Sequence, residues 1–333
     1  MELSHVNTNT GSNRTLTPTV SVVIPTLNEE RNLPHVFAKL PDLISEVILV
    51  DGGSKDRTVA VARELRPDVV VVQQTRTGKG NALACGFAAC TGDIIVMIDA
   101  DGSTDPGEIP SFVAKLTGGD QFVKGTRFNF GGFSHDITPL RKLGNDGLNL
   151  VVNVLFKTKF TDLCYGYNAF WRDVVPALDL PDVDLPRPAD GSKLWGDGFE
   201  IETMINIRAV AEQLKVGEVG STEHERIHGQ SNLNTFRDGF RVLRTIVNEF
   251  GRARARRRAG IAPFATTLAE ASTRRTTDLH PVDPRAPQHT GGRHAADRNA
   301  ADRHAETAAK PVGVRSLDDL RALQARALDD RKA

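Results

Sequence analysis

Apolar runs alternate with helix-like segments over the first hundred residues of the chain. Strands are predicted at 20–24, 46–50, 69–73 and 93–98. The last of these is apolar almost throughout, which indicates a strand buried on both faces. The segments between them have helical patterns, and Asn28 is a candidate cap for a helix that continues to about Lys39. This alternation predicts an α/β fold with a mostly parallel sheet and helices on both faces.

The loops that follow these four strands are polar or glycine-rich. Parallel strands bring their carboxyl ends to one edge of a sheet, where ligands bind. The last loop contains Asp99 and Asp101, whose carboxylates repel each other by roughly 4 kcal/mol at an effective dielectric of about 20. A divalent cation relieves this repulsion, and Mg2+ and Mn2+ prefer oxygen ligands. On this pair alone, a metal site and a solvated turn are equally good interpretations.

Composition and charge narrow the class of protein. The 333 residues are 39% hydrophobic, enough for one large domain or two small ones. Residues 251–333 carry 17 Lys/Arg and 10 Asp/Glu, against 25 and 32 before them, so a basic tail follows an acidic body. The three cysteines have no metal-ligand spacing, which favours reduced thiols and a cytoplasmic protein. The polar first residues lack the apolar run of a signal peptide, and no stretch is apolar enough to span a membrane.

Two common nucleotide-binding motifs fit poorly. Gly78-Lys79-Gly80 follows a strand and opens a helix, with Asp99 about twenty residues further on, as in dinucleotide-binding folds. However, Leu83 stands where that fingerprint has its third glycine, and the turn after the first strand contains no glycine. A P-loop is excluded because the chain has no Gly-Lys-Ser/Thr sequence.

Four motifs, in the same order, resemble those of family 2 glycosyltransferases. They are Ser21–Glu30 (SVVIPTLNEE), Val50–Thr58 (VDGGSKDRT), Gly78–Ala82 (GKGNA) and Asp99–Asp101 (DAD). The resemblance covers about Val20 to Phe250 and implies a GT-A fold, an α/β architecture that binds nucleotide sugars. Later motifs, including Gly125-Thr126-Arg127 and His228–Leu233, are most similar to the dolichol-phosphate mannosyltransferase branch.

This resemblance implies roles for residues on the donor side. Pro25, Leu27, Asn28 and Glu29 are expected to line the nucleotide pocket, Asp51 to bind the base and Lys79 to lie near the diphosphate. Asp99 and Asp101 are expected to hold the ribose and a Mg2+ or Mn2+ ion that bridges the diphosphate, with Asp101 as the direct ligand. The branch usually has Gln two residues after the second aspartate, where this chain has Ser103, so a third ligand from that position is in question.

Candidates for the acceptor side come from the second half. Arg127 follows a predicted strand at 121–124 and is either a bidentate phosphate ligand or a surface arginine. Arg141 begins a predicted helix at 138–156, where it suits an anionic acceptor. We interpret the apolar stripe of that helix as core rather than as a lipid-facing surface; it comprises Leu140, Leu143, Leu148, Val151, Val152 and Leu155. Asp162 resembles an active-site aspartate of the branch.

Two acidic or mixed segments follow. Asp197, Glu200 and Glu202 open a helix predicted to reach about Leu214, and the helix dipole alone explains them. They also form the one obvious carboxylate cluster that can supply a general base. In the branch, the segment containing Arg226 and Ser231 helps to clamp the phosphates, although Asn232 stands where a lysine is usual.

The periodic pattern ends after Phe250. We expect a GT-A domain at 19–250, disordered residues at 1–18, and a mostly disordered basic tail at 251–333 with a short helix at 316–331. Five arginines between 252 and 258 have two interpretations: contact with anionic lipid headgroups, at about 1 kcal/mol per basic residue, or a solvated linker. Nucleic-acid binding is disfavoured because no recognised module accompanies the cluster.

The resulting hypothesis is an inverting, metal-dependent transfer of a hexose from a nucleotide sugar to a polyprenyl phosphate. Such an acceptor is already an anion at neutral pH and needs no strong base. One rival is transfer to a hydroxyl of a soluble or lipid-linked saccharide, which requires a carboxylate base. Another is a non-catalytic nucleotide-sugar-binding protein. The expected location is the cytoplasm, either free or at the inner face of the membrane.

Overall fold

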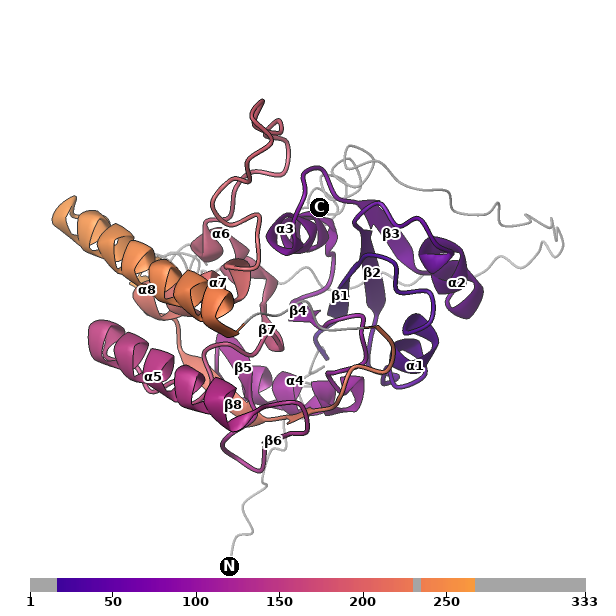
Figure 1. Cartoon of the computed structure of the whole chain (residues 1–333), viewed down its shortest axis with the longest axis horizontal. Coiled ribbons are helices and arrows are strands. Elements are labelled where there is room, and N and C mark those ends of the chain that lie inside the picture. The colour runs from indigo at the N-terminus through magenta and orange to yellow at the C-terminus, as the bar shows by residue number, and fades with distance from the viewer. Residues whose placement is uncertain (1–16, 230–234, 267–333) are drawn as a thin grey trace, which may run out of the picture.

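A seven-stranded sheet forms the centre of the computed structural model (Figure 1). The structure describes residues 17–229 and 235–266. The strand order is β3-β2-β1-β4-β7-β5-β8. The strands are β1 (Val20–Thr26), β2 (Glu46–Asp51), β3 (Val70–Gln73), β4 (Ile94–Met97), β5 (Phe122–Thr126), β7 (Asn168–Trp171) and β8 (Val216–Gly220).

Strand direction brings the expected loops together. Only β7 runs against its neighbours in this sheet, pairing antiparallel with β4 and β5, while the other strand pairs are parallel. The carboxyl ends of β1, β2, β3, β4 and β5 therefore lie at one edge. The predicted mostly parallel α/β sheet is confirmed.

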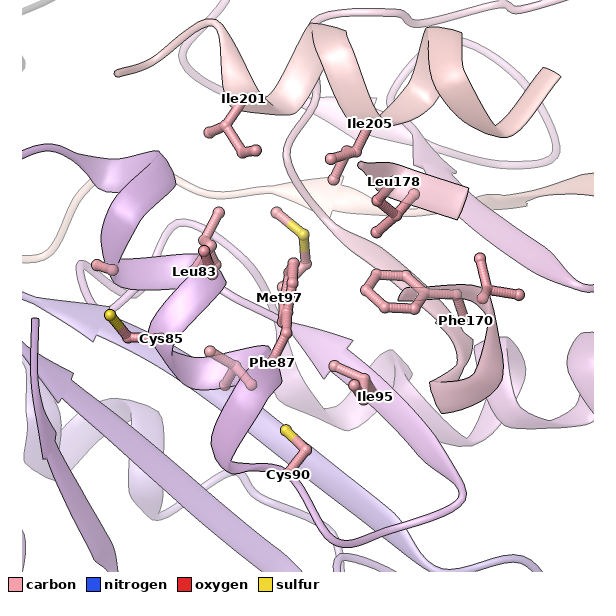
Figure 2. Packing of buried hydrophobic residues seen from close by; sticks show 14 of the residues in the cluster. Leu83, Cys85, Phe87, Cys90, Ile95, Met97, Phe170, Leu178, Ile201 and Ile205 are labelled. Carbon is pink, nitrogen blue, oxygen red and sulfur yellow. The ribbon is translucent and has the colours of Figure 1, made fainter. Parts of the chain in front are cut away.

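Helices cover both faces of this sheet. Side chains of a strand alternate between faces, so Val23 joins one core cluster while Val22 and Ile24 join the other. The first cluster is covered by α3 (Lys79–Ala89), α6 (Val175–Leu178) and α7 (Ile201–Ala211), and Figure 2 shows α3 packing against β4 there. The second is covered by α1 (Leu33–Phe37), α2 (Thr58–Leu65) and α4 (Ile109–Thr117).

Two long helices, α5 (Pro139–Phe156) and α8 (Thr235–Arg258), pack side by side away from the α1–α2 side of the sheet (Figure 1). A third core cluster joins them, with Val152 and Ile246 fully buried. The rings of Phe156 and Phe250 meet edge to face at 5.7 Å. Nearby, the short strands β6 (Phe133–Ser134) and β9 (Thr222–Glu223) form a separate pair.

The first loop differs from the sequence-based expectation. Asn28 does not cap a helix but adopts a left-handed conformation, with φ of 58°. Its side chain instead accepts a hydrogen bond from Lys55 N at 2.8 Å, which ties the loop after β1 to the loop after β2. The helix therefore begins only at Leu33 and ends at Phe37.

Helix α8 passes through the domain boundary predicted at 250 and ends at Arg258. Two of the clustered arginines are bound to the domain: Arg252 pairs with Asp179, and Arg256 Nε lies 3.2 Å from Glu212 Oε1. The rest of the predicted tail, including the helix at 316–331, lies outside the described residues. So do residues 1–16. None of the helices in the described ranges combines the length and apolar character needed to cross a bilayer.

The apolar stripe predicted for α5 is core only in part. Val152 is buried, and Leu148, Val151 and Leu155 pack against the third cluster. Leu140 and Leu143, however, are 55% and 70% exposed. They lie before the stretch of α5 that packs against α8.

A buried ion pair joins α7 to α8 and generates a stability prediction. Arg208 Nε and Nη2 each lie 2.9 Å from a carboxylate oxygen of Glu249, and the two side chains are 5% and 2% exposed. Glu249→Ala leaves a buried arginine without its carboxylate, so the free energy of unfolding should fall by about 3–5 kcal/mol.

The matched control is Glu64→Ala, which breaks the exposed Arg57–Glu64 pair of 2.7 Å. It should lower the free energy of unfolding by no more than about 1 kcal/mol. Urea denaturation of both variants checks this, and equal losses would contradict the role given to Glu249.

Candidate active site

Backbone amides hold Asp51 at the end of β2. Its carboxylate accepts hydrogen bonds from Gly53 N and Ser54 N, each at 3.1 Å, and the residue is 5% exposed. Ser54 Oγ in turn accepts a hydrogen bond from Asn28 N at 2.9 Å. Leu27, next to it, is 57% exposed. The segment from Pro25 to Glu29 thus lies beside Asp51 at the carboxyl edge, with one apolar side chain open to a ligand.

Lys79, the first residue of α3, contacts two carboxylates. Its Nζ lies 2.6 Å from Asp99 Oδ1 and also donates to Glu202 of α7. Burial alone would lower the pKa of Lys79, but the charges of Asp99 and Glu202 raise it above its ordinary value. Burial raises the pKa of Asp99, while Lys79 opposes that shift and Asp101 adds to it. Lys79 therefore keeps its charge and favours the ionised form of Asp99.

Asp101 contacts a second cation, Arg226, from the loop after β9. Arg226 Nη2 lies 2.8 Å from Asp101 Oδ2, and its Nη1 lies 3.5 Å from Glu29 Oε1. Asp101 Oδ1 accepts hydrogen bonds from Ser103 N at 2.9 Å and Ser103 Oγ at 2.7 Å. Burial raises the pKa of Glu29, and a hydrogen bond from Asn32 and the charge of Arg226 counteract it. Acidic groups from two loops thus share one guanidinium.

The donor set at this edge fits a hard divalent cation held together with a phosphate ligand. Within the described ranges, no three His, Cys, Asp or Glu side chains converge on one metal position. Asp99 and Asp101 do offer carboxylate oxygens one residue apart. Magnesium is usually bound by one or two carboxylates together with substrate phosphates and water. The residues present therefore suit a cation whose remaining ligands come from a bound diphosphate.

The glycines beside Lys79 are required by the close approach of another loop. A Cβ at Gly78 would lie 2.0 Å from Asp197 O, and one at Gly80 would lie 1.8 Å from Gly196 O. Gly80 N donates to Asp197 O at 2.9 Å. These glycines therefore let the loop at 196–198 cover the start of α3.

A buried ion pair fixes this loop. Arg76 Nε and Nη2 donate to the two carboxylate oxygens of Asp197 at 2.7 and 2.9 Å, and both side chains are 2% exposed. Glu200 Oε1 accepts hydrogen bonds from Gly196 N and Gly198 N at 2.9 and 3.1 Å. Asp197 and Glu200, our candidate bases, thus make contacts that shape the loop beside Lys79.

Arg127, one of our candidates for binding the acceptor, is enclosed by carboxylates. It donates bidentately to Asp162 at 2.7 and 2.9 Å, and its Nη1 lies 2.9 Å from Glu223 Oε2. Asp162 is fully buried. The edges of the guanidinium that a phosphate ligand would contact therefore face protein carboxylates, and the side chain is only 10% exposed. Arg141 is more open: its Nη1 lies 3.3 Å from Asp136 Oδ2, and its side chain is 24% exposed.

Among the sequence-predicted residues, the structure brings together one cluster, made of Glu29, Lys79, Asp99, Asp101 and Arg226. Arg127, in the loop after β5, and Asp162, in the loop before β7, form a second cluster. Ser231 lies outside the described residues. Sequence reasoning missed Arg76, whose partner is 121 residues away, and Glu223; no local pattern marks either. Glu202 was noted only as a candidate base, yet it pairs with Lys79.

Residues 21–178 match the model of the family described as glycosyl transferase family 2. The chain belongs to this family. A curated relative is the low-salt glycan biosynthesis hexosyltransferase Agl6 of Haloferax volcanii, 31% identical over 237 residues, covering 69% of this chain and 53% of that protein. Another is the dolichol-phosphate mannosyltransferase of Pyrococcus furiosus, 30% identical, covering 64% of this chain and 59% of that protein. The family 2 chain thus spans little more than half of these relatives.

Solved structures support the same fold. Glucosyl-3-phosphoglycerate synthase of Mycobacterium tuberculosis is 26% identical and covers 70% of this chain and 81% of its own, with a TM-score of 0.53. A complex of that enzyme with Mn2+, UDP-glucose and phosphoglyceric acid aligns with a TM-score of 0.53 at 25% identity, over 70% of this chain and 80% of that one. The predicted GT-A fold is confirmed.

The pKa relation between Lys79 and Asp99 yields a testable pH dependence. Lys79 lowers the pKa of Asp99, so Lys79→Met should raise it further. Because a cation binds the deprotonated carboxylate, Mn2+ binding by this variant should be lost at a higher pH than in the wild type as the solution is acidified. At alkaline pH, where the carboxylates are ionised in both proteins, the variant should bind Mn2+ at least as tightly.

Titration of free Mn2+ by electron paramagnetic resonance across a pH series measures this shift. Lys55→Met, which removes an exposed lysine from the neighbouring loop, is the control and should follow the wild-type profile. Coincident profiles for Lys79→Met and the wild type would show that Lys79 does not govern the ionisation of Asp99.

Proposed function

We propose that this family 2 glycosyltransferase moves a hexose, with inversion, from a nucleoside-diphosphate sugar to a polyprenyl phosphate, and that Mg2+ or Mn2+ assists. The observation that carries the proposal is the cluster at the carboxyl edge, where Asp99 and Asp101 each face a cation. The complex of the mycobacterial synthase with Mn2+ and UDP-glucose supports the donor and the metal. The similarity to a dolichol-phosphate mannosyltransferase supports the acceptor.

The loops after β1 and β2 receive the nucleoside. Pro25, Leu27, Asn28 and Glu29 line this pocket, where exposed Leu27 offers apolar contact. Asp51 forms a hydrogen bond with the base, and Asp99 forms one with the ribose. The hydrogen bond from Lys55 N to Asn28 Oδ1 holds the two loops in position before the donor arrives. Less conformational entropy is then lost when the donor binds.

Charge at the diphosphate governs the departure of the leaving group. The diphosphate gains negative charge as the sugar leaves, and cations fixed near it stabilise that charge. Asp101 and Asp99 would hold the metal, which as a Lewis acid stabilises the same charge. For Asp101 Oδ2 to contact a metal, Arg226 has to leave it, and its guanidinium is then free to bind a phosphate oxygen. Lys79 supplies a second, fixed positive charge.

The state of the carboxylates favours an acceptor that is already an anion. Asp162 and Asp197 are each bound bidentately by an arginine. Glu200 accepts hydrogen bonds from two backbone amides, and Glu202 accepts a hydrogen bond from Lys79. These bonds occupy the carboxylate oxygens that a general base has to present to an acceptor hydroxyl. An acceptor phosphate needs no such base, and Arg141, whose side chain is 24% exposed, would supply the positive charge that binds it.

A hydroxyl acceptor is the alternative, and one finding favours it. The mycobacterial synthase is solved with phosphoglyceric acid, a small anion that carries a hydroxyl group. Transfer to a hydroxyl requires a base within about 3 Å of the attacking oxygen, directly or through a water. Glu202, in contact with Lys79 beside Asp99, is then the best-placed carboxylate. A non-catalytic sugar-nucleotide-binding protein is the third possibility, and a measurement of turnover would exclude it.

Asp101 and Arg226 should respond in opposite ways when substituted. Asp101→Asn keeps the volume but removes a charge, so turnover should fall by at least about a hundredfold and Mn2+ binding should weaken. Arg226→Ala removes the competitor for Asp101, so Mn2+ should bind more tightly without donor. The same variant should bind the nucleoside diphosphate more weakly, by about 2 kcal/mol.

Calorimetry with Mn2+ alone and then with UDP and GDP separates these effects. Asp68→Asn, on an exposed loop, is the control and should match the wild type. If chelation with EDTA and Asp101→Asn both leave turnover unchanged, the metal assignment is wrong.

The acceptor class is tested at Arg141. Arg141→Ala removes a charged hydrogen bond to an acceptor phosphate, so the acceptor KM should rise by about thirtyfold while the donor KM stays constant. Asp136→Asn frees Arg141 from its carboxylate partner and should leave the acceptor KM unchanged or lower it. Consumption of a saccharide hydroxyl acceptor but not of polyprenyl phosphate, with loss of turnover in Glu202→Gln, would replace the phosphate acceptor by the hydroxyl one.

A further inference from the structure

Helices α5 and α8 share an exposed apolar face. Leu148, Val152, Val242 and Ile246 belong to one core cluster. Phe156, the last residue of α5, packs on Phe250 near the end of α8, so the C-terminal parts of the two helices lie together. Each helix also has large apolar side chains that face away from this cluster. Their exposed fractions are 55% for Leu140, 70% for Leu143, 65% for Leu150, 67% for Val154, 70% for Phe240, 38% for Leu243 and 56% for Val247.

The spacing of these side chains places them on one stripe per helix. Intervals of three, four and seven residues return a side chain to the same face of a helix. On α8, Phe250 packs against α5, and Val247 and Leu243 lie one turn and two turns before it on the adjoining strip. Helices α5 and α8 lie side by side (Figure 1), so we infer that the two stripes flank the contact between them. Exposed apolar residues scattered singly are ordinary, but a patch of this extent marks a binding surface.

The same two helices are strongly basic. They carry ten Lys or Arg residues and three acids. Asp146 pairs with Lys142, Asp238 pairs with Arg241, and Glu249 is buried against Arg208. In the part of the chain that the structure describes, no ion pair involves Arg254, Arg257 or Arg258 at the end of α8. Uncompensated positive charge therefore accumulates at one end of the apolar face.

A pocket lies at this basic end. It has a volume of about 200 Å³ and is lined by Leu155, Phe156, Phe250, Ala253, Arg254 and Arg257. Four of these residues are apolar, and the two arginines supply planar donors that match phosphate oxygens. An apolar floor with two guanidinium groups suits a phosphate group that is attached to hydrocarbon.

We propose that the α5–α8 face binds the surface of an anionic lipid bilayer, with a lipid phosphate held in the pocket by Arg254 and Arg257. Apolar side chains that enter the headgroup region beside basic residues are typical of helices that lie in a membrane interface. A second copy of the chain fits this face less well, because a symmetric contact would place two faces of net positive charge against each other. The proposal goes beyond the transfer reaction and does not depend on the acceptor.

Docking by this face would orient the acceptor side toward the lipid. The ammonium of Lys142, near the start of α5, lies 4.9 Å from the centre of the Phe128 ring, and that ring neighbours Arg127. The N-terminal end of the face therefore adjoins the loop after β5. An acceptor anchored in the bilayer would meet the enzyme at this end.

Vesicle binding by the full chain, without donor or acceptor, tests the proposal. Wild-type protein should co-sediment with vesicles of phosphatidylcholine and phosphatidylglycerol but not with phosphatidylcholine alone. Arg254→Ala/Arg257→Ala should partition about thirtyfold more weakly, since each basic residue near an anionic surface contributes about a factor of five. Leu150→Glu/Val247→Glu should lose binding altogether, because both charges would enter the interface.

Controls with the same change of charge lie elsewhere on the surface. Arg63→Ala/Lys115→Ala and Leu43→Glu/Leu65→Glu alter exposed residues outside α5 and α8 and should bind as the wild type does, apart from a small general effect of net charge. Circular dichroism verifies that all variants are folded. Equal binding by the face variants and the wild type would overturn the proposal, as would binding that ignores phosphatidylglycerol. Conversion of a dimer to a monomer by Leu150→Glu/Val247→Glu, without vesicle binding by the wild type, would assign the face to a second copy.

Discussion

Carboxylates crowded at the carboxyl edge of the sheet require cations, and the architecture of the site follows from that requirement. Asp99 and Asp101 leave β4 one residue apart, and Glu29 and Glu202 approach from other segments. Two like charges about 4 Å apart repel by roughly 4 kcal/mol at an effective dielectric of about 20. Lys79 and Arg226 offset this repulsion by direct contact. The two differ in surroundings: Lys79 is 14% exposed and Arg226 is 33% exposed.

The rest of the fold explains why Lys79 is the fixed cation. The loop at 196–198 packs on the start of α3, which excludes any side chain at Gly78 or Gly80. That loop is held by the Arg76–Asp197 pair. Arg226, by contrast, reaches Asp101 from the loop after β9, which is joined to the site by the backbone hydrogen bond from Ile227 N to Asp101 O at 3.2 Å. A metal bound by Asp101 would therefore displace a partner that keeps a second carboxylate contact, with Glu29 Oε1 at 3.5 Å.

Much of this arrangement was predictable because it follows local patterns. Buried strands, the parallel sheet and the loops at its edge follow from apolar runs and from the geometry of strand–helix units. The failures concern interactions distant in sequence. Asparagine is a common helix cap, yet the side chain of Asn28 accepts a hydrogen bond from the backbone amide of Lys55 in the next strand–helix loop. From the sequence, Arg127 is a candidate phosphate ligand, but in the structure its guanidinium pairs with Asp162 and Glu223. Asp197 is acidic at a helix start, but its buried arginine partner lies far back in the chain.

The central claim is that Asp101 exchanges Arg226 for a divalent cation when a nucleoside diphosphate binds. A crystal of the protein grown with Mn2+ and UDP, with data collected at the manganese absorption edge, tests it most directly. The account predicts an anomalous peak at about 2.0–2.2 Å from a carboxylate oxygen of Asp101, as first-row metal ions bind carboxylates, with the guanidinium of Arg226 moved to a phosphate oxygen. A nucleotide bound at this edge with Asp101 still paired to Arg226, and no manganese beside it, would contradict the account.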